Sequence, residues 1–225
     1  PGKKLLYASL DELKKNLRGM LAGCRKVAMQ YSPRNAIPYV SMVDAGTVEL
    51  VRAQGSRVVS SADLVQRFEA CWSAGQYRSH LEAGRVIHRV IQDAFARAAS
   101  QAHAGKSKSS LTEHDLQQWI LKRFRAAGVV TDEPPIVAVN AHAGDPHYAP
   151  RAVGSSRIRP GDLLLLDVWG KMDRPGSVYY DVTWVGYLGR EVPAKYAKIF
   201  AIVVAARDRA IAFAQESLAA GRAVQ

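Results

Sequence analysis

The sequence predicts an α+β protein in which an α/β segment precedes a larger domain of helices and strands. Residues 1–60 alternate helix, strand, helix and strand, which is the order of a helix layer packed on a sheet. A long amphipathic helix over 76–101 and two strongly apolar strands near 163–169 and 178–184 follow. Residues 1–60 are too few for a complete α/β domain, so we interpret them as the C-terminal part of one, followed by a second domain over 61–225.

The composition is that of a soluble globular protein. The chain has 225 residues, of which 48% are hydrophobic and 23% are charged. No apolar run approaches the roughly 20 residues that span a bilayer, and no signal peptide is visible. Cys24 and Cys71 do not make a disulfide framework. We therefore expect a cytoplasmic protein that does not bind membranes.

The net charge of +11 raises the question of a nucleic-acid partner. The lysines and arginines are scattered through helices, often near Asp or Glu, and no basic run carries interleaved aromatic residues. A solvated basic surface explains this pattern better, so we expect no nucleic-acid partner.

Local signals place the elements of the first segment. Ser9 and Glu12 have the spacing of a capping box, which predicts a helix from Leu10 that ends near Gly23. Short strands are predicted over 26–31 and 57–60, with a helix over 43–53 between them.

The second segment follows the same logic. Ser61 caps a helical stretch, a break falls near 73–75, and an apolar stripe runs along the helix over 76–101. Residues 105–110 read as a polar surface loop. Thr112 caps a helix over 113–127, and a strand over 136–140 follows Pro134-Pro135. Asp162 caps a tight turn at 159–162, and a final helix runs from Pro193 to about residue 220.

Two carboxylates within the apolar strands are the main functional signal. If the strands are neighbours joined by a loop at 170–177, Asp167 and Asp181 lie side by side. Burying two acidic groups is costly unless a cation lies between them, and carboxylates are oxygen ligands for divalent metals. A turn cap or an arginine partner is the alternative. Thr183 points to the same face as Asp181 and can hydrogen-bond a ligating carboxylate, or it simply fills the strand.

The histidines give a weaker signal. His147 lies in the loop of residues 140–150, where it is a candidate contact for a ligand or an ordinary exposed side chain. We assign no role to His142 in the same loop. The helical histidines are expected to face solvent or neighbours on their own helices, and these are His80, His88, His103 and His114.

Three motifs in order resemble a known family. They are Asn-Ala followed by Pro-His-Tyr at 140–148, Arg-Pro-Gly-Asp leading into Leu-Leu-Asp at 159–167, and Tyr-Asp-Val-Thr at 180–183. Together they resemble the pita-bread metallopeptidases, which include proline aminopeptidase, prolidase, methionine aminopeptidase and the related creatinase. The proline-specific branch fits best, because its members place an α/β domain before the catalytic domain. Residues 61–225 then correspond to the N-terminal part of that catalytic domain.

The resemblance implies a role for each site residue. Asp167 would bind one metal, Asp181 would bridge two, and His147 would contact substrate and help stabilise the tetrahedral intermediate. The family uses two divalent ions, here Mn, Co or Zn, and a metal-bridging hydroxide that attacks the peptide carbonyl. The implied substrate is a peptide with proline at the second position, and the implied assembly is a homodimer.

The chain also departs from the family pattern. Trp184 stands where many relatives carry Arg, and the loop at 170–177 is longer. The family completes its site with one His and two Glu further downstream, whereas here only Glu191 and Glu216 follow Asp181, outside any ligand motif. We therefore expect a span truncated at both ends. The alternatives are an inactive pita-bread module that binds peptides or proteins, and a creatinase-like amidinohydrolase.

Overall fold

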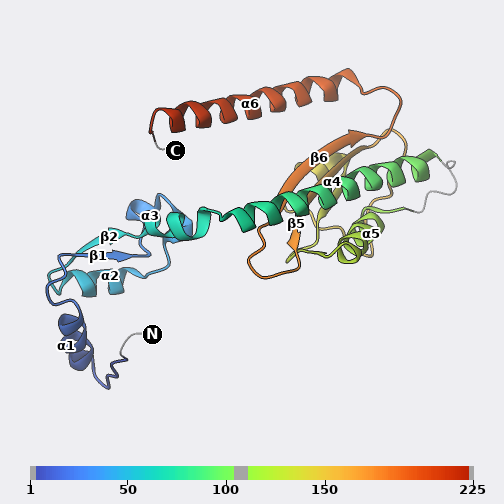
Figure 1. Cartoon of the computed structure of the whole chain (residues 1–225). Helices are drawn as coiled ribbons and strands as arrows, with labels where there is room; N and C mark the ends of the chain where they lie inside the picture. Colours follow the sequence, from blue (N-terminus) through green and yellow to red (C-terminus); the bar gives the residue numbers. More distant parts are fainter. Residues whose placement is uncertain (1–3, 104–110, 223–225) are drawn as a thin grey trace. The chain divides into compact units, whose positions relative to one another are not determined.

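The computed structural model describes residues 4–103 and 111–222. The chain divides into two compact units, Pro1–Ser73 and Ala74–Gln225, which are described separately (Figure 1). The polar loop expected at 105–110 lies outside the described residues. The assignment of residues 1–60 to the end of one domain and of residues 61–225 to the start of another stays a prediction.

The first unit is a small helix-and-strand layer. Strands β1 (Lys26–Met29) and β2 (Arg57–Ser60) pair in parallel, as expected when a helix connects them. Helix α2 (Ala45–Arg52) provides this connection, and Asp44 caps it by accepting from the backbone N–H of Thr47 at 2.9 Å. The remaining elements are α1 (Leu10–Met20), the 3-10 turns Pro33–Asn35 and Pro38–Val40, α3 (Ala62–Val65) and a π-helical turn (Gln66–Ala70).

The second unit contains a four-stranded antiparallel sheet with β5 in its centre. Strand β5 (Leu163–Met172) pairs along one edge with β6 (Tyr180–Tyr187) and along the other with β4 (Ile136–Val139) and the short β3 (Val129–Val130). Helices α4 (Ala74–His103) and α5 (Glu113–Ala126) precede these strands, and α6 (Ala194–Ala219) follows them.

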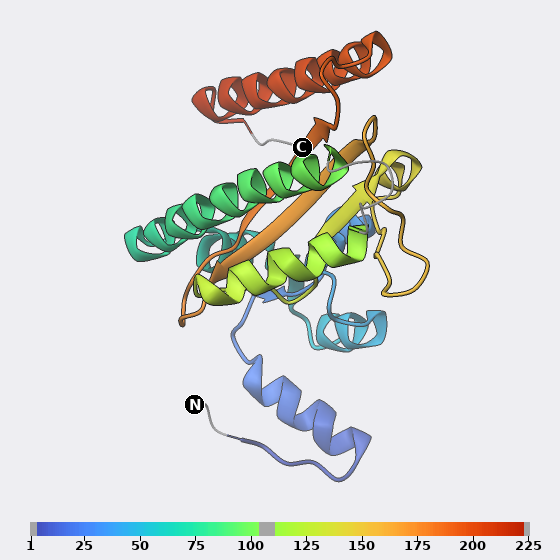
Figure 2. The same ribbon diagram turned by 90° about the vertical axis from the view of Figure 1, so that its right-hand side faces the viewer.

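One face of this sheet is covered by α4 and α5 (Figure 2). Alternate residues of β5 are buried against the two helices, because successive side chains of a strand point to opposite faces. The largest members of this core are Ile87, Leu116, Ile120, Phe124, Ile158, Leu164 and Leu166. We call the opposite face, which carries Leu163, Leu165, Asp167 and Trp169 of β5, the open face.

The observed architecture confirms a mixed helix and sheet fold. Element types agree with the sequence-based expectations, and most bounds differ by one to three residues. Strand β3 was not expected, because two valines are too short a run to signal a strand. None of the helices within the described residues is long and apolar enough to cross a membrane.

Two helical histidines correct a sequence-based expectation. His80 and His88 were expected to face solvent or their own helix, but both contact the start of β6. His80 Nδ1 lies 2.7 Å from the carbonyl oxygen of Tyr179, and His88 Nε2 lies 2.8 Å from Oη of Tyr180. These partners are distant in sequence, so helical periodicity gave no sign of them.

Candidate functional site

The antiparallel register brings the two aspartates to one face of the sheet. Asp167 stands opposite Thr183, and Trp169 stands opposite Asp181. Directly paired residues share a face, and so do residues two apart on one strand, so Asp167, Thr183 and Asp181 all lie on the open face. The two aspartates are diagonal neighbours, a relation that separates residues by about 7–8 Å. The expected proximity is therefore present, with Thr183 as the residue directly across from Asp167.

Hydrogen bonding and charge distinguish the two carboxyl groups. Oγ1 of Thr183 donates to Oδ1 of Asp167 at 2.5 Å, which is the hydrogen bond that the spacing of Thr183 suggested. The pKa of Asp181 is raised, first by partial desolvation of its carboxyl group and second by the negative charge of Asp167, although the residue as a whole is exposed. The charge of Asp167 thus makes ionisation of Asp181 less favourable.

The donor chemistry of the pair suits a divalent cation. Neither Asp167 nor Asp181 belongs to any ion pair formed by the described residues. Carboxylate oxygens are the ligands that hard cations prefer, and a cation would relieve the repulsion that raises the pKa of Asp181. Within residues 4–103 and 111–222, no three acidic, histidine or cysteine side chains gather as a metal site. Asp167 and Asp181 by themselves would offer a cation two carboxylate ligands.

His147 lies on an irregular loop that follows β4. We call residues 140–150 the His147 loop; its first part is the 3-10 turn Asn140–Gly144. His147 is exposed, and its backbone N–H donates to Oδ1 of Asp145 at 2.9 Å. Because Val139 pairs with Leu164, the loop leaves the sheet near the start of β5. Among the described hydrogen bonds and ion pairs, none joins His147 to either aspartate.

The start of the His147 loop is fixed to the start of β5. The side-chain amide of Asn140 donates to Oδ1 of Asp162 at 2.8 Å, and its Oδ1 accepts from the backbone N–H of Leu163 at 3.0 Å. Asn140 has a φ of 52°, in the left-handed region that Asn tolerates. Asp162 also accepts from the backbone N–H of Arg159 at 2.7 Å, which confirms its expected role in the turn. An open pocket of about 210 Å³ adjoins this corner, lined by Val139, Asn140, Ser156, Arg157, Arg159 and Asp162.

Sequence reasoning missed Glu113, the first residue of α5. Its side chain is fully buried, and its carboxylate contacts groups of the His147 loop. His142, to which the sequence assigned no role, places Nδ1 2.8 Å from Oε1 of Glu113. Oη of Tyr148 donates to Oε2 of Glu113 at 2.6 Å. An acidic residue in the first turn of a helix is ordinarily an exposed partner of the helix dipole, so its burial had no local signal.

Comparison with known proteins gives one family match. A model of metallopeptidase family M24 matches residues 80–224, which include most of α4, the His147 loop and both aspartates. The comparison with curated proteins found no match.

The fold resembles several solved structures. Dipeptidase PepE from Mycobacterium ulcerans is 22% identical with a TM-score of 0.53, covering 80% of this chain and 43% of that one. X-Pro aminopeptidase from Thermotoga maritima MSB8 is 17% identical with a TM-score of 0.51, covering 92% of this chain and 53% of that one. X-prolyl aminopeptidase from Caenorhabditis elegans, described as a cytosolic enzyme with a di-nuclear active site, is 22% identical with a TM-score of 0.54; the match covers 65% of this chain and 23% of that one.

These likenesses concern the fold. All three identities are below 25%, and the present chain spans about half or less of each matched structure. The matches support the assignment of this chain to part of a pita-bread fold, in agreement with the resemblance seen in the sequence.

Proposed function

The chain belongs to metallopeptidase family M24, and on that premise we propose that the whole protein is a metal-dependent peptidase that hydrolyses an N-terminal Xaa-Pro bond. The observation that carries the proposal is the Asp167 and Asp181 pair, on one face of neighbouring strands and without an ion-pair partner among the described residues. The X-Pro and X-prolyl aminopeptidase structures that share the fold favour this substrate class. A peptide with proline at the second position and a homodimeric assembly are parts of the same proposal.

The two aspartates would hold divalent cations in this enzyme. Asp181 would serve both ions, and Asp167 would serve one of them. Thr183 keeps one oxygen of Asp167 occupied as an acceptor, which fixes the orientation of that carboxylate. Bound divalent cations supply Lewis-acid chemistry and lower the pKa of a coordinated water. A two-ion centre is favoured by the di-nuclear site described for the Caenorhabditis elegans protein.

His147 would contact the peptide from the loop beside the sheet. Its imidazole is exposed, as a substrate contact requires, while its backbone N–H is engaged by Asp145. A protonated imidazole donates from both ring nitrogens and can stabilise negative charge that develops on the attacked carbonyl oxygen. His147 would therefore contact the substrate, and the aspartate carboxylates would bind the cations.

The proposal is tested with the full-length natural protein, freed of metal with EDTA and then supplied with Mn²⁺. Release of the N-terminal residue from Ala-Pro-Ala is measured, with Ala-Ala-Ala as the control peptide. We expect Mn²⁺-dependent cleavage of Ala-Pro-Ala and little cleavage of Ala-Ala-Ala. The variant Asp181→Ala should lose both turnover and Mn²⁺ binding by calorimetry.

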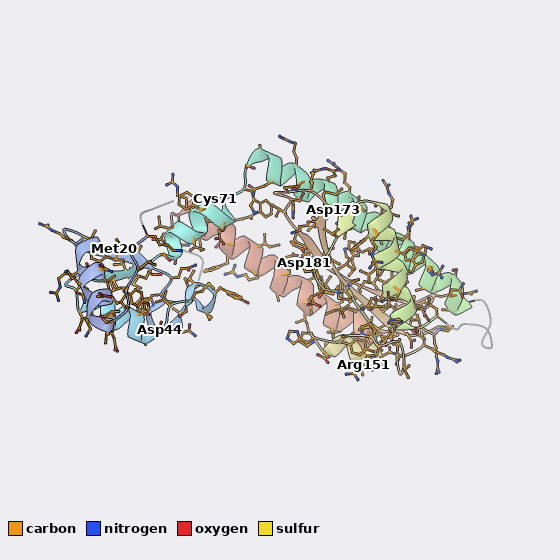
Figure 3. The ribbon with its side chains drawn as sticks, turned by 90° about the horizontal axis from the view of Figure 1, so that it is seen from below. Met20, Asp44, Cys71, Arg151, Asp173 and Asp181 are labelled. Atoms are coloured by element: carbon orange, nitrogen blue, oxygen red, sulfur yellow. The ribbon has the colours of Figure 1, made fainter. Side chains whose placement is uncertain are left out.

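The matched control is Asp173→Ala, which removes a carboxylate from the connection that joins β5 to β6. Asp173 lies apart from Asp181 (Figure 3), and the control should keep its activity. Full activity in Asp181→Ala would refute the assignment. Tight binding of Ala-Pro-Ala without cleavage would favour the inactive binding module, and hydrolysis of creatine alone would favour the amidinohydrolase.

A further inference from the structure

The buried carboxylate of Glu113 is the most connected polar group beside the candidate site. Its Oε1 accepts from the backbone N–H of Val139 at 2.8 Å and lies 2.8 Å from His142 Nδ1. Its Oε2 accepts from Oη of Tyr148 at 2.6 Å and from the backbone N–H of Ser156 at 2.9 Å. A carboxylate has about four acceptor positions, and here all of them are used. A buried charge is tolerated only when it is satisfied in this way.

The partners of Glu113 flank the His147 loop on both sides. Val139 ends β4 immediately before the loop, His142 and Tyr148 belong to the loop, and Ser156 follows it. Apart from the 3-10 turn at its start, the described loop has no regular secondary structure. Two backbone hydrogen bonds lie within the loop, from the N–H of Asp145 to His142 and from the N–H of Tyr148 to Asp145. The Glu113 carboxylate adds anchors at two loop side chains and at the backbone on either side of the loop.

The backbone on both sides of His147 is fixed by hydrogen bonds. Tyr148 follows it directly, donates to Glu113 and stacks on His142 with ring centroids 4.2 Å apart. Burial, and then the hydrogen bond and charge of Glu113, raise the pKa of Tyr148 to about 12, so the phenol stays a donor at all ordinary pH values. On the other side, Asp145 accepts from the backbone N–H of His147. The exposed imidazole thus extends from a backbone that is fixed before and after it.

We propose that Glu113 is a positioning residue of the candidate site: its carboxylate fixes the backbone on which His147 meets the peptide. The inference rests on the proposed function for the role of His147. Glu113 then affects the reaction by positioning His147, and not by stabilising α5. A substitution of Glu113 should therefore slow the reaction when His147 is present and have little effect when His147 is absent.

The decisive variant is Glu113→Gln in the full-length natural protein. Gln has the same shape, but an amide NH₂ that donates hydrogen bonds replaces one of the two carboxylate oxygens. The two groups that donate to that oxygen therefore lose their acceptor. Asp115→Asn is the matched control. Asp115 accepts from the backbone N–H of Thr112 at 3.0 Å at the same end of α5, and its described hydrogen bonds join it to Thr112 and not to the loop. Both variants remove one carboxylate from the first turn of the same helix.

Amide hydrogen exchange gives a readout that does not depend on turnover. Glu113→Gln should speed exchange of the Val139 and Ser156 amides at least about tenfold, because these protons lose a charged acceptor. Asp115→Asn should leave both rates within about twofold of the wild type. Equal acceleration in the two variants would mean that Glu113 only stabilises the helix end, and the proposal would be wrong.

Kinetics on Ala-Pro-Ala with Mn²⁺ test the link to His147. We expect Glu113→Gln to lower kcat by up to about 100-fold with little change in KM, because a misplaced catalytic contact acts mainly in the transition state. In the His147→Ala background the same substitution should change kcat by less than about twofold. Additive losses in the double variant would overturn the proposal.

A second variant covers the case in which Glu113→Gln does not fold. Tyr148→Phe keeps the ring that stacks on His142 and removes one hydrogen bond to Glu113. It should lower kcat less than Glu113→Gln does and show the same dependence on His147. If the wild type cleaves no Xaa-Pro peptide, the proposed function fails, while the exchange rates still decide whether Glu113 fixes the loop.

Discussion

Removing one of the paired carboxylates should stabilise the metal-free chain. Asp167 and Asp181 are diagonal neighbours on the open face, and no described residue forms an ion pair with either. At about 7 Å, two like charges repel by about 0.6 kcal/mol in bulk water and by about 2.4 kcal/mol at an effective dielectric constant of 20. Solvent and salt reach this face, so we expect Asp181→Asn to raise the free energy of unfolding by about 1 kcal/mol.

The assay is thermal unfolding of the 225-residue chain in EDTA at neutral pH and low protein concentration. A gain of about 1 kcal/mol corresponds to a melting temperature about 2–4 °C higher than that of the wild type. Asp173→Asn is the control, because it removes the same charge at an exposed position that lies apart from Asp181 (Figure 3). Its effect should stay within about 0.5 kcal/mol.

The pH dependence has a definite sign. The pKa of Asp181 is raised in the folded chain, so the wild type loses stability as the pH rises from the ordinary value of 3.8 through the raised pKa. The advantage of Asp181→Asn should therefore be full at neutral pH and absent below about pH 3.8. A variant that melts at or below the wild-type temperature in EDTA at neutral pH would refute the repulsion argument.

Three further predictions concern packing and assembly. Gly170→Ala places a methyl group 2.7 Å from Cγ1 of Val129 and should cost about 1–3 kcal/mol in urea unfolding, while Gly144→Ala, with open space around it, should be near neutral. Thr112→Ala removes the side-chain cap of α5 and should cost about 1 kcal/mol by the same measurement, and an unchanged midpoint would contradict the cap. Helix α6 exposes isoleucine, valine and phenylalanine side chains at 55–61% between residues 199 and 203, so the isolated chain should self-associate in sedimentation velocity; a monomer at all concentrations would be contrary to this expectation.

The local elements followed from the sequence because short-range chemistry decides them. Thr112 caps α5 through Asp115, and the apolar run before Asp167 forms the central strand of the sheet. The period of two along a strand also placed Thr183 and Asp181 on one face. Asp167 shares that face only in alternate registers of the two strands, so the sequence indicated the carboxylate pair but did not fix it.

The sequence alone did not determine the diagonal register or the neighbours of buried polar groups. A hairpin connection of this length permits several registers, and packing against α4 and α5 selects the one in which Thr183 faces Asp167. Glu113 is anchored by a backbone amide 26 residues away and another 43 residues away. Such contacts depend on which surfaces the folded sheet brings together. The sequence therefore determined the elements and the two carboxylates, and the tertiary structure decided what fixes the loop that carries His147.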